Sequence, residues 1–383
     1  MYIQSFEGNW LSHPFWKTRF LLSEPGDLAS LRDSGVEVVW IDTDKGLDVA
    51  DADGATPEPK RVPPPPAERP PAQCSAAEEM HRATRILSRS KQAVTQLFNE
   101  ARLGKAVDVE SCLPVVEEIS ESVTRNSAAL ISLARLKTKD EYTYMHSVSV
   151  CALMVALARQ LGLNEEQTRE TGLAGLLHDV GKMAMPEDVL NKPGKLTDEE
   201  FAVMKSHPER GNEILLMSDM TAESVLDVCL HHHEKMDGSG YPYRLQGDRI
   251  SLYARMGAIC DVYDAITSNR PYKTAWDPSD SLMRMAKWEG HFDPVIFQAF
   301  VKSVGIYPIG SLVKLHSGRL GVVIEQNPGN LTKPVLRVFF STKSNAAIPM
   351  QVLDLSRNHV DDRIVGREDP QQWGFKHLDK LWH

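Results

Sequence analysis

Apolar residues recur at helical spacing through the middle of the chain, from about residue 75 to residue 305. The ranges 75–103 and 110–137 mix apolar residues with Glu, Arg and Lys in the pattern of amphipathic helices. From residue 141 the pattern is richer in apolar residues, and 148–161 is almost free of charge, as in a buried helix. The pattern predicts a helical connector over 74–140 and a compact all-helical domain over 141–305. The first connector helix is equally suited to dimerisation, so a homodimer is a second expectation.

Several helix boundaries in this domain carry capping signals. A polar N-cap followed three positions later by Glu or Gln satisfies two backbone amides, and Pro is favoured at the first helical position. The pairs with these patterns are Asn164 with Gln167, Thr197 with Glu200, and Asp293 with Pro294. Gly181 is placed where a C-terminal glycine would end the helix that leads to His178 and Asp179.

The N-terminal part of the chain has a different pattern. Residues 1–50 predict a small α/β domain, in which a β-branched run at 36–41 forms a strand after a short helix near 27–32. Residues 51–73 contain eight prolines, and such a segment cannot build a core. We therefore expect 51–73 to be an extended, proline-rich linker.

After residue 306 apolar and polar residues alternate between Gly and Asn turns, which predicts strands. The range 306–383 is therefore predicted to be a short β-rich C-terminal appendage, with a weakly defined tail after about 356. The strand-like stretches are 311–315, 320–324 and 335–340. The fold class expected for the whole chain is mainly α, a helical bundle flanked by these two smaller parts.

Composition narrows the class of protein. The 383 residues are 42% hydrophobic and 25% charged, as in ordinary globular proteins, and the net charge of −9 argues against a DNA-binding surface. No run of about 18 apolar residues predicts a membrane span, and the N-terminus lacks the pattern of a signal peptide. Five cysteines without CxxC spacing indicate reduced thiols and a cytoplasmic protein.

Six of the thirteen histidines fall between residues 146 and 233, and aspartates accompany them. Alone, His146 would more often be a hydrogen-bonded core residue and His207 a helix-start residue. The adjacent pair His178-Asp179, at the end of an apolar run, favours a metal site instead. Imidazole and carboxylate together suit Fe, Mn, Zn or Ni better than Ca or Mg. The candidate ligands are His146, His178, Asp179, His207, His232, His233 and Asp261.

Seven ligands are too many for one ion and suit a pair, with Asp179 placed to bridge ions about 3.5–4 Å apart. Two such ions would lower the pKa of a bridging water and yield hydroxide near neutral pH. They would also neutralise a bound phosphodiester. The ligand set therefore predicts metal-assisted phosphoester hydrolysis.

The segment from His231 to Pro242, with sequence HHHEKMDGSGYP, makes a family resemblance specific. The chain resembles the HD-GYP family, bacterial phosphodiesterases of cyclic di-GMP within the HD metal-dependent phosphohydrolase superfamily. Residues 1–50 resemble a poorly characterised domain often found ahead of HD-GYP domains. The other matching pieces, in chain order, are His146-Ser147, His178 to Lys182, His207-Pro208 with Gly211, Asp261 to Ala265, and Arg270 to Lys273.

The resemblance implies a role for each residue. Asp179 would bridge two divalent ions, Fe or Mn in the first place, with Zn and Ni as alternatives. Lys182 would stabilise a phosphate or assist proton transfer, and Tyr241 would shape the guanine or ribose pocket. Arg270 and Lys273 would reach phosphate oxygens. The first ion would be held by His146, His178, Asp179 and Asp261, and the second by Asp179, His207, His232 and His233.

Two departures from the family pattern affect this assignment. Some members carry a glutamate four residues before the first ligand histidine, where it recruits a third metal, and this chain has Tyr142 there. A phenol is a poor ligand at neutral pH, so we expect two metals. The family pairs two histidines before the glutamate, whereas this chain has three. We assign His232 and His233 by their spacing to Glu234, and a pair of His231 with His232 is the alternative.

The resemblance implies hydrolysis of cyclic di-GMP to the linear dinucleotide pGpG, and some members continue to GMP. An alternative is a slow or inactive domain that binds cyclic di-GMP and signals through partners such as diguanylate cyclases, the GGDEF proteins. A third hypothesis is hydrolysis of another nucleotide, including other cyclic dinucleotides.

Overall fold

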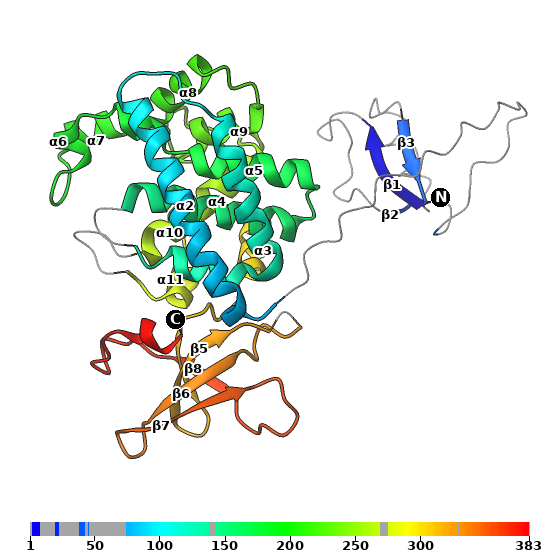
Figure 1. Cartoon of the computed structure of the whole chain (residues 1–383), viewed down its shortest axis with the longest axis vertical. Helices are drawn as coiled ribbons and strands as arrows, with labels where there is room; N and C mark the ends of the chain where they lie inside the picture. The colour runs from blue at the N-terminus through cyan, green and yellow to red at the C-terminus, as the bar shows by residue number, and fades with distance from the viewer. Residues whose placement is uncertain are drawn as a thin grey trace, which may run out of the picture. The chain divides into compact units, whose positions relative to one another are not determined.

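The structure is a computed structural model, and it describes residues 2–7, 20–22, 38–42, 45, 74–137, 142–268, 275–327 and 329–382. The chain divides into two compact units, Met1–Ala67 and Glu68–His383. Figure 1 labels their helices and strands. The predicted helix near 27–32 and the predicted linker at 51–73 lie outside the described residues.

The first unit contains a three-stranded antiparallel sheet with strand order β2-β1-β3. Its strands are β1 (Tyr2–Glu7), β2 (Phe20–Leu21) and β3 (Val38–Ile41). The predicted strand at the end of this region is confirmed as β3. The strand at the N-terminus was not predicted, although it occupies the centre of the sheet and its Ile3 is fully buried.

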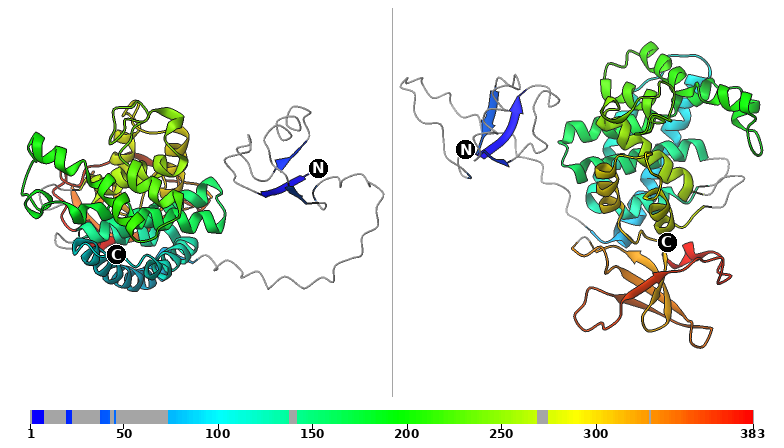
Figure 2. Two further views of the ribbon diagram at one scale, coloured as in Figure 1. Left: turned by 90° about the horizontal axis from the view of Figure 1, so that it is seen from above. Right: turned by 180° about the vertical axis from the view of Figure 1, so that it is seen from behind.

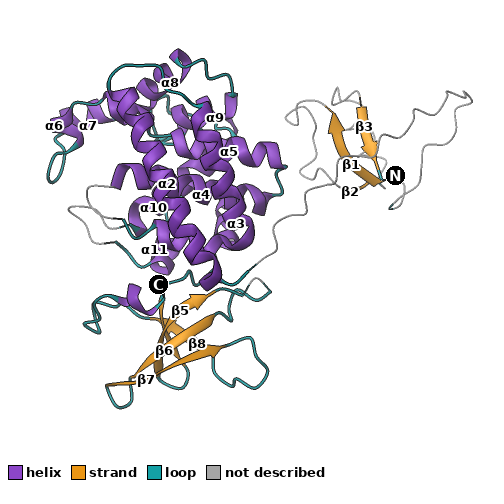
Figure 3. Cartoon of the chain, viewed as in Figure 1, coloured by secondary structure: helices purple, strands orange, loops and turns teal. Residues whose placement is uncertain are grey.

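The second unit is built mainly of helices, which confirms the predicted mainly α fold (Figure 3). Short 3-10 turns lie between the α-helices at η2 (Glu110–Cys112), η3 (Val180–Ala184) and η4 (Gly247–Arg249). The α-helices are α2 (Ala76–Arg102), α3 (Leu113–Ala134), α4 (Tyr142–Leu161), α5 (Glu165–Leu177), α6 (Glu187–Leu190), α7 (Asp198–Met204), α8 (His207–Met217), α9 (Glu223–His231), α10 (Leu252–Thr267), α11 (Pro278–Met285) and α12 (Pro294–Val304).

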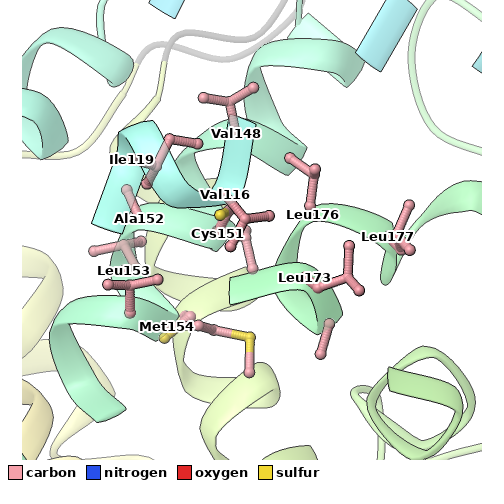
Figure 4. Packing of buried hydrophobic residues seen from close by; sticks show 14 of the residues in the cluster. Val116, Ile119, Val148, Cys151, Ala152, Leu153, Met154, Leu173, Leu176 and Leu177 are labelled. Carbon is pink, nitrogen blue, oxygen red and sulfur yellow. The ribbon is translucent and has the colours of Figure 1, made fainter. Parts of the chain in front are cut away.

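Helix α4 is the centre of the bundle. Its near-continuous apolar sequence is explained by contacts on all sides: α3, α5, α10 and α12 pack against it. Figure 4 shows Cys151 and Met154 of α4 among side chains of α3 and α5, including Val116 and Leu173. Among the described helices, α4 alone is long and apolar enough to cross a membrane, and 78% of its most apolar stretch is buried in the bundle. Because it is buried in this way, α4 is a core helix of the bundle.

Helices α2 and α3 lie side by side on one face of the bundle (Figure 2) and share its core. A buried charge joins them, because the Glu79 carboxylate accepts hydrogen bonds from Nε and Nη2 of Arg125 at 2.8 and 2.9 Å. It also accepts one from Ser122 Oγ at 2.7 Å. The same core continues from these helices into α4 and α5 without a break.

The capping prediction is confirmed at all three helix starts. Asn164 and Thr197 form complete capping boxes ahead of α5 and α7. The Asp293 side chain accepts from the amides of Val295 and Ile296, and Pro294 is the first residue of α12. These signals succeed because each capping bond joins residues two or three positions apart, so it depends only on local sequence.

The C-terminal part forms a five-stranded antiparallel sheet of order β7-β6-β5-β4-β8. Apolar residues alternate between its faces and form a separate cluster on each. The tail after 356 is better defined than expected, because β8 pairs with β4 and Trp382 is buried in one of these clusters. The strands are β4 (Leu312–Leu315), β5 (Arg319–Glu325), β6 (Val335–Ser341), β7 (Ala346–Asp354) and β8 (Ile364–Arg367).

Candidate metal centre

The bundle brings the seven predicted ligands to one place, from five segments of the chain. Six of them are buried, and His233 is partly exposed. Within the described residues, two groups of ligand atoms are close enough to hold a metal ion, and both include Asp179. By position the residues are His146 in α4, His178 and Asp179 after α5, His207 at the start of α8, His232 and His233 after α9, and Asp261 in α10.

The two carboxylate oxygens of Asp179 face different histidines. Its Oδ2 lies 3.4 Å from Nε2 of His146 and 3.3 Å from Nε2 of His178. Its Oδ1 lies 3.3 Å from Nε2 of His207 and 3.7 Å from Nε2 of His232. A carboxylate in this position can serve one ion through each oxygen.

Asp261 is the second carboxylate of the cluster. Its Oδ1 lies 3.0 Å from Nε2 of His146 and 4.0 Å from Nε2 of His178, and its Oδ2 lies 3.8 Å from Nδ1 of His233. It therefore lies near the first histidine pair and also near His233.

Backbone and carboxylate oxygens orient the imidazoles. His178 Nδ1 lies 2.8 Å from Gly175 O, and His207 Nδ1 lies 2.8 Å from Met204 O. His232 Nδ1 is 3.0 Å from Val228 O, and His146 Nδ1 is 2.6 Å from Oδ2 of Asp264. An acceptor at Nδ1 places the proton there and leaves the Nε2 lone pair free for a metal. Each of these four rings is thus prepared as an Nε2 ligand.

The electrostatics of Asp179, His232 and His233 favour the protonation states that a metal requires, whereas for His178 the lowering of the pKa by burial is more than offset by Asp179, which raises it. Burial by itself raises the pKa of Asp179, but the Lys182 ammonium and His178 hold the pKa well below its usual range. Burial and the neighbouring histidines lower the pKa of His232 far below its usual value, and burial lowers that of His233 to about 3. Anionic carboxylates and neutral imidazoles are the forms that bind divalent ions.

Two polar atoms at this centre test whether a metal fits. Among the described residues, His178 Nε2 and Asp179 Oδ1 are buried without a hydrogen-bond partner. Buried polar atoms are almost always satisfied, so an unsatisfied imidazole nitrogen and an unsatisfied carboxylate oxygen in one cluster indicate a site suited to a cation. The residues present therefore fit divalent metal ions.

The structure decides which of the three consecutive histidines face the centre. His231 turns away, because its Nδ1 bonds Oδ1 of Asp227 at 2.7 Å and its ring edge contacts Tyr243. His232 and His233 belong to the metal-binding group with Asp179 and His207. The geometry therefore favours the pair chosen from the spacing to Glu234 over the alternative pair.

Tyr142 and Lys137 occupy the side of the centre next to His146. The Tyr142 ring stacks on the His146 ring with an interplanar angle of 8°. The Lys137 ammonium is fully buried and forms an ion pair with Asp264. Sequence reasoning missed both Lys137 and Asp264. Asp264 follows Asp261 by three residues on one helix face, which was the available signal, whereas the end of α3 offered none for Lys137.

Gly181 has a role different from the one predicted. It does not end α5 in a left-handed conformation, because it lies within η3 and its φ is not positive. An added Cβ would lie 1.9 Å from His207 O and 2.4 Å from Gly211 N. The expectation was wrong because the glycine is required by a close approach of α8, a contact distant in sequence.

Lys182 and Tyr241 lie at the edge of the centre. The Lys182 ammonium donates to Asp179 Oδ2 and is partly exposed. The Tyr241 ring stacks on His233 with centroids 4.6 Å apart, and burial and Asp261 raise the pKa of its phenol, which stays protonated. Arg270 and Lys273, the other predicted substrate contacts, lie outside the described residues.

Comparisons with known proteins agree with the motifs. The family model of the HD domain matches residues 122–296, and that of a domain of unknown function, DUF3391, matches 1–112. The second match includes α2, which packs within the helical bundle. The N-terminal family thus extends into the core of the second unit by one helix.

The chain is 54% identical to a cyclic di-GMP phosphodiesterase of Pseudomonas aeruginosa, over all of this chain and 92% of that protein. It is 40% identical to a cyclic di-GMP phosphodiesterase response regulator of Xanthomonas campestris, over 52% of this chain and 53% of that one. It is also 37% identical to a 3'3'-cGAMP-specific phosphodiesterase of Vibrio cholerae, over 46% and 41%. The resemblance drawn from residues 146–273 is thereby confirmed, and the chain belongs to the HD-domain family of cyclic di-GMP phosphodiesterases.

Proposed function

We propose that this chain hydrolyses cyclic di-GMP to pGpG at a centre of two divalent transition metals. Further cleavage of pGpG to GMP is an open question that a pGpG assay answers. The observation that carries the proposal is the position of Asp179, whose two oxygens face two different histidine groups. Cyclic di-GMP is proposed as the substrate because the P. aeruginosa relative, which matches all of this chain, is a cyclic di-GMP phosphodiesterase.

Each ligand has a proposed place. His146, His178 and Asp261 would complete one site with Oδ2 of Asp179, and His207, His232 and His233 would complete the other with Oδ1. When bound, the two ions supply Lewis acidity and a nucleophile derived from water near neutral pH. Imidazole and carboxylate ligands suit iron or manganese, with zinc and nickel as alternatives.

The chain's own residues would bind and orient the substrate. The Lys182 ammonium already contacts Asp179, so it is placed to hold a phosphate oxygen or a proton beside that carboxylate. Tyr241 presents a protonated phenol next to His233, suited to donate a hydrogen bond to the ribose or guanine. Arg270 and Lys273 are proposed to reach phosphate oxygens.

The proposed setting is the cytoplasm, where the substrate would be found. All five cysteines lie within the described residues and are free thiols, four of them buried. Contact with diguanylate cyclases and self-association through α2 stay predictions.

The decisive experiment uses the full chain loaded with Mn²⁺ or Fe²⁺, with metal content measured and cyclic di-GMP, 3'3'-cGAMP and pGpG as substrates. We expect cyclic di-GMP to be the preferred substrate and Asp179→Ala to abolish turnover. His231→Ala is the matched control and should retain it. Absence of cyclic di-GMP turnover at an occupancy near two metals per chain would reject the proposal and favour a binding role.

A further inference from the structure

A cavity of about 570 Å³ lies next to the metal centre. Its lining includes Lys205 and Ser206 of the α7–α8 turn and residues of the loop between Gly238 and Arg244. Tyr241 lines the cavity, and its ring also stacks on His233. The ring therefore lies between the cavity and this predicted ligand. A molecule that extends away from the metal centre past Tyr241 would enter this cavity.

Lys205 is held in the cavity by aromatic rings. It follows the last residue of α7, and its Nζ lies 4.6 Å from the centroid of Phe201 and 5.5 Å from that of Tyr241. Cation–π contacts of this kind orient an ammonium while leaving it charged. No carboxylate among the described residues pairs with it, so its hydrogen-bonding capacity is available to an anion.

Arg244 also lines the cavity, in an unusual backbone conformation. Its φ is +57°, in the left-handed region that residues other than glycine seldom occupy. The flanking amides are held by one buried carboxylate, because Tyr243 N donates to Oε1 of Glu234 at 2.7 Å and Leu245 N donates to Oε2 at 3.0 Å. A strained residue persists where its surroundings over-determine it.

Glu234 links this arrangement to the metal centre. It follows His232 and His233 directly, so the segment that supplies two predicted ligands also fixes the loop that carries Arg244. Arg244 is exposed and pairs with no carboxylate among the residues that the structure describes. Glu209, which also lines the cavity, is not within ion-pair distance of either cation and acts instead on Tyr243, whose pKa is raised by burial and by Glu209.

We propose that Lys205 and Arg244 form a second phosphate site, which holds the phosphodiester of a cyclic dinucleotide that is not being cleaved. This inference rests on the proposed function. A cyclic dinucleotide carries two phosphodiesters, and only one can occupy the metal centre at a time. The net charge of the chain is −9, so the other phosphodiester needs local cations to enter. Arginine offers a bidentate fork to phosphate and lysine a compact charge.

The test compares two substrates in the metal-loaded full chain. Cyclic di-GMP can reach both sites, whereas bis(p-nitrophenyl) phosphate has a single phosphodiester and can occupy the metal centre alone. Arg244→Gly removes the side chain and suits a left-handed backbone, and Lys205→Met keeps the apolar stem on Phe201 and Tyr241. Each should raise KM for cyclic di-GMP by about 10-fold or more, the size of a lost charge-assisted hydrogen bond, with little change in kcat.

Three controls make the result specific. Neither variant should alter turnover of bis(p-nitrophenyl) phosphate, and Lys205→Arg should recover most of the lost affinity. Arg249→Ala removes an exposed cation in η4, which follows this loop and is not on the cavity lining, and should leave both substrates unaffected. The KM of the wild type for cyclic di-GMP should rise with salt more steeply than that of either variant.

The outcomes separate the two proposals. An unchanged KM for cyclic di-GMP in both variants, with an active wild type, would overturn the second phosphate site and leave the proposed function intact. An equal loss on both substrates would also overturn it, because the residues would then act on the metal centre or the fold. A wild type that cleaves only the single phosphodiester would reject the proposed function and this site together.

Discussion

Nδ1 of His146 lies 2.6 Å from Oδ2 of Asp264, and the same oxygen pairs with the fully buried ammonium of Lys137. His146 Nε2 faces Asp179 and Asp261 on its other side. Asp264 therefore orients a predicted metal ligand, and Lys137 neutralises the carboxylate that does so. Burial raises the pKa of the Asp264 carboxyl, but Lys137 and His146 more than offset this and lower the pKa to about 2.

We predict that Asp264→Asn weakens metal binding by about 10- to 100-fold, the usual effect of losing a partner behind a ligand histidine. Competition with a chelator of known affinity measures this. The variant also removes the carboxylate that neutralises the buried Lys137 ammonium. Lys137→Met combined with Asp264→Asn should therefore regain stability without regaining metal affinity. Wild-type metal affinity in Asp264→Asn would contradict the orienting role.

The neighbouring histidines should differ in their contribution to metal content. His233→Ala is expected to reduce the bound metal from about two ions per chain toward one, because His233 belongs to the group around Oδ1 of Asp179. His231→Ala should retain both ions, since its ring bonds Asp227 outside the centre. Elemental analysis of the two purified variants makes the comparison. Loss of metal from His231→Ala alone would show that the other histidine pair binds.

Gly181→Ala should displace α8 and the ligand at its start. The added Cβ would meet His207 O at 1.9 Å, and backbone on both sides cannot yield as a flexible side chain would. We expect a loss of stability of roughly 2–3 kcal/mol, as for overpacked cores, together with reduced metal binding. Gly366→Ala is the control, because its Cβ would meet nothing within 4 Å. Denaturant unfolding measures the stability of both variants. Equal stabilities would contradict the close approach of α8 to Gly181.

The Glu79 carboxylate should make the stability of the α2–α3 pair depend on pH. Burial raises its pKa, but Arg125 and Ser122 more than offset this, so the folded pKa lies below the ordinary 4.5. Its contribution is therefore complete above pH 4.5 and is lost as the pH falls through the folded pKa. Glu79→Gln should cost about 2 kcal/mol at pH 7, from lost charge-assisted hydrogen bonds.

This cost should be smaller when unfolding is measured below pH 4 than at pH 7, because the pH is then below the ordinary pKa of 4.5 and the stability linked to the lowered pKa is being lost. Glu118→Gln serves as the control, because its pair with Arg89 is largely exposed and should contribute well under about 1 kcal/mol. A difference between wild type and Glu79→Gln that is the same at both pH values would exclude an ionised Glu79 as its source.

Much of the architecture could be predicted because its signals are local. The near-absence of charge at 148–161 predicted the buried helix α4, and the capping pairs at Asn164 and Thr197 marked helix starts through bonds between residues three apart. The ligand types could also be predicted, because imidazole and carboxylate carry their chemistry in any fold. The neighbouring residues that contact and orient these ligands could not be predicted from the sequence.

By itself, then, the sequence determined the helical bundle, the strands of the C-terminal appendage, one strand of the N-terminal sheet and the identity of the seven candidate ligands. The tertiary structure supported His233 over the alternative His231, because the ring of His231 bonds Asp227 whereas His233 lies with Asp179 and His207. It also decided that Gly181 serves a close approach, that Lys137 and Asp264 support His146, and that Lys205 and Arg244 share a cavity. Each of these contacts joins segments far apart in the chain, and no local pattern records which distant segments will meet.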